Sequence, residues 1–134
     1  MRSKLAVVLA ALIVGASGMA PASALAKTCD VQASQVINEG YNRLSLKGRT
    51  ENLKRISCKT LNTIVRGAFR EFVGNGDLTD TARTVNGHRY YVTLKRPFFA
   101  AFLRSKRIPQ VMDVADARFD DICRIRWTGK QTDT

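Results

Sequence analysis

The chain has 134 residues, of which 22 are lysine or arginine and 11 are aspartate or glutamate, so its net charge at pH 7 is +11. This length supports one domain with a modest core and excludes a second, and no repeat or linker interrupts the sequence. A charge of this size favours anionic partners, namely a phospholipid surface, an anionic envelope polymer, nucleic acid or an acidic protein.

Residues 1–26 are typical of a cleaved export signal. Arg2 and Lys4 precede an apolar run over residues 5–14, and small residues lead to a cleavage position after Ala26. The run is too short to span a bilayer, which needs roughly 20 apolar residues. We therefore expect a periplasmic or secreted mature chain, residues 27–134, without a transmembrane span. Cleavage removes two of the 22 basic residues and none of the 11 acidic ones, which leaves a net charge of +9.

Two helices are predicted in the first half of the mature chain. Asp30 is a good N-cap, and apolar residues return at helical spacing over residues 31–46. A second helical pattern covers residues 50–74, with a bend or break near Ser57. Cys58 and the apolar residues that follow it share one face of this helix, and the opposite face carries a basic patch formed by Lys59, Arg66 and Arg70.

A β-hairpin is predicted over residues 80–94. The dipeptide Asn86-Gly87 between two alternating segments is a strong signal for a two-residue turn. The pairing that follows places Val85 opposite His88. The more apolar face of the hairpin, which we expect to pack on the long helix, is then formed by His88, Tyr90, Val92 and Leu94.

Two further helices are predicted after the hairpin. Pro97 is suited to the first turn of a short helix over residues 97–107. Apolar residues keep helical phase over residues 111–125, which favours a final helix there. The rival interpretation is a strand over residues 122–127, ICRIRW, because an isolated hairpin gains stability from a third strand. The tail from about residue 128 is expected to be disordered.

One disulfide is expected, because all three cysteines lie in the mature part of an exported chain. If the two N-terminal helices formed a tight antiparallel pair, Cys29 and Cys58 would be offset by roughly 15 Å along it. A disulfide needs Cα atoms within about 7 Å, so we favour Cys29 with Cys123. A break near Ser57 would allow the alternative pairing of Cys29 with Cys58.

The residues capable of nucleophilic chemistry are Cys58 and His88. A thiol at a helix N-terminus has a lowered pKa, and an imidazole at the start of a strand is its candidate base. The order of these residues is similar to that in papain-like and transglutaminase-like hydrolases, and this resemblance, at two positions, implies a cysteine hydrolase. The structural alternative places Cys58 in the core or in a disulfide. One histidine and three scattered cysteines predict no metal site, and no motif predicts a cofactor.

A candidate anionic-surface site combines aromatic and basic side chains, with rings for the headgroup boundary and cations for phosphates. Its residues are Lys95, Arg96, Phe98, Phe99, Phe102, Arg104, Lys106 and Arg107. Other basic residues, with Tyr90 and Tyr91 as stacking platforms, give a weaker nucleic-acid-binding or nuclease-type toxin alternative.

The sequence as a whole predicts an α+β fold: a small, mostly helical domain of about four helices with one β-hairpin at residues 80–94, stapled by a disulfide. The predicted function is non-catalytic binding of an anionic surface or an acidic protein, with the hydrolase and nucleic-acid hypotheses as alternatives.

Overall fold

The computed structural model describes residues 27–37 and 42–133, and the predicted signal segment at residues 1–26 lies outside this part. The fold over the described residues is mostly β, so the prediction of a mostly helical domain is wrong. The elements in chain order are β1 (Lys27–Val36), β2 (Asn42–Leu53), α1 (Cys58–Gly74), β3 (Asp80–Val85), β4 (His88–Leu94), α2 (Phe98–Arg104), β5 (Gln110–Asp116) and β6 (Asp121–Asp133).

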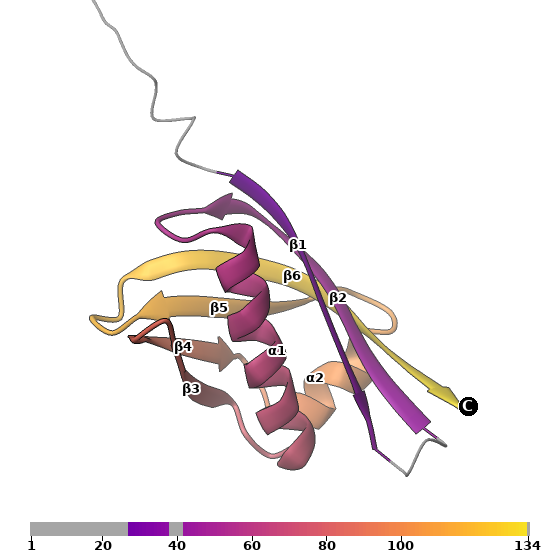
Figure 1. Ribbon diagram of the computed structural model, residues 1–134. Coiled ribbons are helices and arrows are strands. Elements are labelled where there is room, and N and C mark those ends of the chain that lie inside the picture. Colours follow the sequence, from indigo (N-terminus) through magenta and orange to yellow (C-terminus); the bar gives the residue numbers. More distant parts are fainter. Residues whose placement is uncertain (1–26, 38–41, 134) are drawn as a thin grey trace, which may run out of the picture.

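The strands form one antiparallel sheet in the order β1-β2-β6-β5-β4-β3. Pairing of β2 with β6 joins the N-terminal hairpin to the four strands that follow α1. The sheet curls so that α1 lies across its concave side and contacts both edge strands, β1 and β3 (Figure 1). Outward-facing side chains of β2 and β6 are exposed on the opposite face, which we call the open face.

Residues 31–46, predicted as a helix, belong to β1 and β2. Along β1, the buried residues Val31 and Ala33 alternate with exposed polar residues. Along β2, the buried residues Leu44 and Leu46 alternate with residues that are less buried, so every second side chain of both strands enters the core. Val36 and the residue after it, which supported the helical phase, are about 36–38% exposed. The alternation of buried and exposed side chains, which is typical of a strand, therefore describes this segment, and the helical spacing does not.

Residues 111–125, predicted as the last helix, form β5, a tight turn and the start of β6. Met112 and Ile125 are fully buried on the inner face, whereas Phe119 lies in the turn and is 71% exposed. The rival strand over residues 122–127 is correct. The predicted disordered tail is also wrong over the described residues, because β6 continues to Asp133 and pairs with β2.

Helix α1 begins where the break was predicted. Ser57 is its N-cap, and the Ser57 hydroxyl accepts a hydrogen bond from the Thr60 N–H at 3.1 Å. The predicted helical pattern is confirmed from Cys58 to Gly74, whereas residues 50–53 continue β2. The face that enters the core is formed by Leu61, Ile64, Val65, Ala68, Phe69 and Phe72.

The predicted β3–β4 hairpin is confirmed with its register, Val85 opposite His88 and Arg83 opposite Tyr90. Asn86 and Gly87 both have positive φ, as the two-residue turn requires. His88 itself is exposed, although the rest of its predicted face, Tyr90, Val92 and Leu94, is buried.

Helix α2 lies on the same side of the sheet as α1 and closes one end of the core. Phe98 stacks on Trp127 of β6 at a centroid distance of 6.1 Å and on Phe72 of α1 at 5.4 Å. The Phe102 ring crosses β6 at Gly129, where a Cβ would approach the ring to 2.5 Å. A glycine at this position therefore allows α2 to pack closely on the strand.

The disulfide joins Cys29 to Cys58, so the favoured pairing with Cys123 is wrong and the alternative is observed. A bend at residues 55–56, where Arg55 has a φ of 67°, separates β2 from α1, and the Cα atoms of Cys29 and Cys58 lie 5.5 Å apart. Cys123 is free and buried. The bond ties the edge strand β1 to the first turn of α1.

Reduction of the disulfide should lower the free energy of unfolding by about 3–4 kcal/mol, because a loop of this length restricts the unfolded chain by that amount. Urea unfolding of the oxidised and reduced protein measures the difference. The double variant Cys29→Ala/Cys58→Ala is the control, since a reductant should not change its stability. An identical urea midpoint for both forms of the wild type would contradict the pairing.

Candidate functional site

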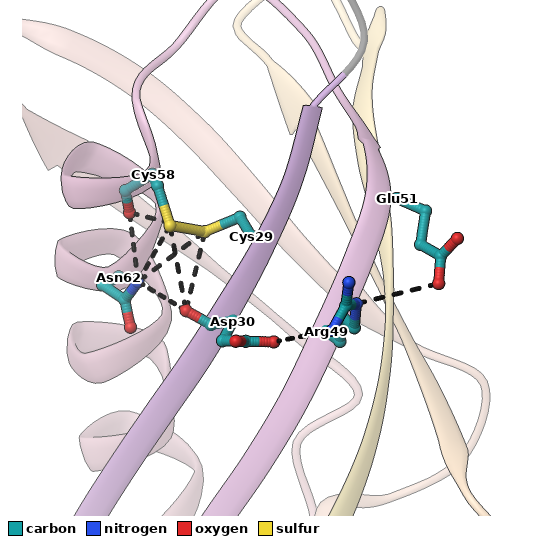
Figure 2. Close-up of polar contacts among 6 residues, drawn as sticks. All are labelled: Cys29, Asp30, Arg49, Glu51, Cys58 and Asn62. Atoms are coloured by element: carbon teal, nitrogen blue, oxygen red, sulfur yellow. Dashed lines mark hydrogen bonds and ion pairs between the residues drawn. A yellow bond between two sulfur atoms is a disulfide. The ribbon is translucent and has the colours of Figure 1, made fainter.

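The cysteine-hydrolase hypothesis is contradicted by the disulfide, because Cys58 has no thiol to act as a nucleophile. Figure 2 shows its sulfur bonded to that of Cys29 beside Asn62. His88 is exposed and lines a cleft of about 420 Å³ at the start of β4. The remaining thiol, Cys123, is 4% exposed, and burial raises its pKa to about 12. It is therefore inert at neutral pH.

The first half of edge strand β1 is covered by polar side chains of α1. The Asn62 amide donates to the carbonyl of Asp30 at 3.0 Å and accepts from the Gln32 N–H at 3.2 Å. The Arg66 guanidinium donates to the Gln32 carbonyl at 3.3 Å. These contacts satisfy backbone groups that an edge strand otherwise leaves unpaired.

The structure divides the predicted anionic-surface residues into core and surface. Phe98 and Phe102 are buried, Arg96 is half-buried and donates to Gln110, and Lys95 is exposed just after β4. The exposed residues of the predicted site that lie on α2 or directly after it are Phe99 and three cations, Arg104, Lys106 and Arg107.

Sequence analysis missed two apolar residues of the same segment, Leu103 and Ile108. They are 63% and 58% exposed, and Phe99 is 48% exposed. Phe99 and Leu103 are four residues apart on α2 and therefore lie on one side of it. We call Phe99, Leu103, Arg104, Lys106, Arg107 and Ile108 the α2 patch. The spacing of four from Phe99 was a signal that could have identified Leu103.

An apolar groove of about 340 Å³ adjoins the α2 patch. Phe99 and Leu103 form one wall, and Ile37, which directly follows β1, and Val73 of α1 contribute to the rest of the lining. The groove gives the exposed rings and aliphatic side chains of α2 a continuous apolar surface.

Ser105 fixes the end of α2 on the sheet. Its side chain is 1% exposed, donates to the Phe102 carbonyl at 2.6 Å and accepts from the Gly129 N–H of β6 at 2.7 Å. Because both partners are buried, this hydroxyl determines where the cations that follow it emerge.

The predicted second basic patch lies on the outer face of α1. Lys59 is near the disulfide, and Arg66 and Arg70 lie beside the β1 edge. A hollow of about 450 Å³ brings these two arginines together with Lys47 of β2. The helical spacing identified the patch, but its continuation onto β2 depends on the fold.

The turn between β5 and β6 is held by Asp116. Its carboxylate accepts from the Arg55 guanidinium at 2.6 Å and from the backbone N–H groups of Arg118 and Asp120. The hydrogen bond from Arg55 is the main cause that holds the pKa of Asp116 below its ordinary value. Phe119, with φ of 64°, stacks on Tyr91 at 4.7 Å. Asp116 lines the same cleft as His88, and its carboxylate has a structural role there, because it holds the β5–β6 turn.

Comparison with protein-family models, curated proteins and solved structures finds no match in any of the three. Within residues 27–37 and 42–133, no group of three or more histidine, cysteine, aspartate or glutamate side chains is arranged to hold a metal ion. Among the same residues, neither helix has the length and apolar character needed to cross a membrane.

Thiol alkylation should label no cysteine in the native oxidised protein near neutral pH, since Cys29 and Cys58 are bonded and Cys123 is buried with a pKa of about 12. Unfolding without reductant should expose Cys123 alone, and reduction should then expose all three. Peptide mass spectrometry locates the labels. Rapid native labelling of Cys58 would contradict the assignment.

The substitution Ser105→Ala should lower the free energy of unfolding by about 1–3 kcal/mol, because the buried Gly129 N–H loses its acceptor. Urea unfolding measures this effect. The control Ser34→Ala removes an exposed hydroxyl and should change stability by less than about 0.5 kcal/mol. Equal stability of the two variants would show that the Ser105 contacts are not important.

Proposed function

We propose that this chain is an exported, non-catalytic binding protein whose α2 patch docks on an anionic lipid surface. The observation that supports this most is the exposure of Phe99, Leu103 and Ile108 directly beside three exposed cations. The cations of the patch, Arg104, Lys106 and Arg107, form no ion pair with any carboxylate of the described residues.

The apolar part of the patch supplies the insertion energy. Burial of a leucine, isoleucine or phenylalanine side chain contributes roughly 1.5–3 kcal/mol relative to full exposure, and these side chains are about half to two-thirds exposed. Their exposure on a small domain is costly in water. Insertion into the headgroup boundary of a bilayer removes that cost.

The basic part supplies attraction and selectivity. A lysine or arginine close to an anionic membrane surface contributes about 1 kcal/mol to binding. This attraction decays over a distance of about one Debye length from the surface. Three such cations next to three apolar side chains give the two combined signals that stable surface attachment needs. A neutral bilayer offers only the free energy of apolar insertion and no electrostatic attraction.

Other features support the proposal of an exported protein that binds without catalysis. The signal-like segment at residues 1–26 and the disulfide are both typical of an oxidising compartment outside the cytoplasm. The one cysteine hypothesised to act in catalysis is bonded, and the free thiol is buried. Binding is therefore the mode of action that these residues favour.

Cosedimentation with phosphatidylglycerol-containing vesicles tests the proposal. The wild type should bind these vesicles at low salt and bind pure phosphatidylcholine vesicles at least about tenfold more weakly, because the three cations lose their partners. The variant Phe99→Ser/Leu103→Ser should also bind the anionic vesicles about tenfold more weakly, because it loses apolar insertion.

The electrostatic part is tested with two variants of equal charge. Arg104→Gln/Lys106→Gln/Arg107→Gln should bind anionic vesicles roughly 100-fold more weakly than the wild type, since about 1 kcal/mol is lost for each of the three cations. The control Lys27→Gln/Arg89→Gln/Arg118→Gln should change binding by less than about threefold. Equal losses in both would indicate attraction by net charge alone and contradict docking through the α2 patch.

A further inference from the structure

The open face of the sheet carries a group of exposed cations. Side chains on the inner face of β2 and β6 are buried, whereas Lys47, Arg49, Arg124 and Arg126 are exposed on the opposite face. This face lies on the side of the sheet away from α1 and α2, so it is separate from the α2 patch (Figure 1).

Two arginines face each other directly across the β2–β6 pair. Arg49 and Arg126 are register partners on the open face. Like charges directly opposite each other on a sheet destabilise it, so this position has a cost in the absence of an anion. An anionic group that contacts both guanidinium groups would remove the repulsion.

The carboxylates of the open face neutralise only part of this charge. Arg49 lies 3.6 Å from Asp30 and 3.7 Å from Glu51, and Figure 2 shows it between these two side chains. Arg124 forms a two-point contact with Asp113. Arg126 has no ion pair within the described part of the chain.

A hollow of about 540 Å³ marks the position of these arginines. It is lined by Arg49, Arg124 and Arg126, with Glu51 and Asn52 at its side. A guanidinium group binds a carboxylate or a sulfate through two parallel hydrogen bonds. Arg126, which has no carboxylate partner among the described residues, offers such a contact in this hollow.

The basic surface continues from this hollow to α1. Lys47 lies two residues from Arg49 on the same side of β2, or about 7 Å along the strand. Lys47 also lines the second hollow, with Arg66 and Arg70 of α1 beyond the β1 edge. A band of cations therefore runs across β6, β2 and β1 to the helix; its residues are Arg126, Arg124, Arg49, Lys47, Arg66 and Arg70.

We propose that this band binds a linear acidic polysaccharide. The polymer lies across the strands, with one anionic group between Arg49 and Arg126 and others at Lys47 and Arg70. A chain with repeated negative charges matches a row of cations better than an isolated anion does, because each further contact is made without a new loss of translational freedom.

The side chains of the band favour this polymer over other anionic ligands. Non-specific single-strand binders stack bases on aromatic side chains, and the band has none, because the exposed stack of Tyr91 on Phe119 lies elsewhere, at the β5–β6 turn. A protein partner is expected to meet buried aromatic or apolar anchors, whereas polar Gln32, Ser34 and Ser45 surround Lys47.

Calorimetric titration of the mature oxidised protein with polygalacturonate tests the proposal. The wild type should bind at about 20 mM salt and weaken steeply by about 200 mM, as contacts between exposed charges do. The variant Lys47→Gln/Arg70→Gln/Arg126→Gln should bind at least about tenfold more weakly and with a shallower salt dependence, because three charge-assisted contacts are lost.

The control is Lys27→Gln/Arg89→Gln/Arg118→Gln, which has the same net charge and should stay within about threefold of the wild type. Equal weakening of both variants, absence of binding to polygalacturonate, or tighter binding to DNA of equal charge would each overturn the proposal. The band variant should still bind anionic vesicles like the wild type, so failure here is distinguishable from failure of docking through the α2 patch.

Discussion

Helix α1 fills the concave side of a sheet whose two edge strands both contact it, and the rest of the molecule depends on this packing. Six apolar side chains of the helix enter the core between β1 and β3, and each of the five that are larger than alanine contributes roughly 1.5–3 kcal/mol. The same helix covers the β1 edge through the disulfide, Asn62 and Arg66. Its outer face is then free to carry Arg66 and Arg70 beside the cations of β2.

The elements that the sequence predicted correctly are those with their own local signals. Helix α1 has an N-cap at Ser57 and a long apolar face, and the β3–β4 hairpin has Asn86-Gly87 at its turn. The two segments that were wrongly predicted as helices failed for different reasons. The turn between β5 and β6 has no glycine, proline or asparagine, and its left-handed position is occupied by Phe119, so nothing interrupted the apparent helical phase of residues 111–125. In residues 31–46, the few apolar positions fitted both the helical period of about 3.6 residues and the strand period of two.

Candidate site residues were harder to predict because composition does not reveal which side of an element faces the core. The sequence grouped Phe98, Phe99 and Phe102, yet only Phe99 is exposed. Prediction of the disulfide pairing required the correct structure of residues 31–53. The helix predicted over residues 31–46 placed Cys29 too far from Cys58, although the two are bonded. The band on the open face could not be seen at all, since Arg49 and Arg126 are 77 residues apart and meet only through strand register.

The pairing of β2 with β6 also determines when the fold can form. Residues 42–49 pair with residues 126–133, so the central contact of the sheet joins the two ends of the described chain. Without β6, no strand joins the N-terminal hairpin to the strands β3 to β5. Non-local strand pairing of this kind makes folding slow, typically in milliseconds to seconds. The six-stranded sheet therefore closes only when β6 is available, after every other described element has been synthesised.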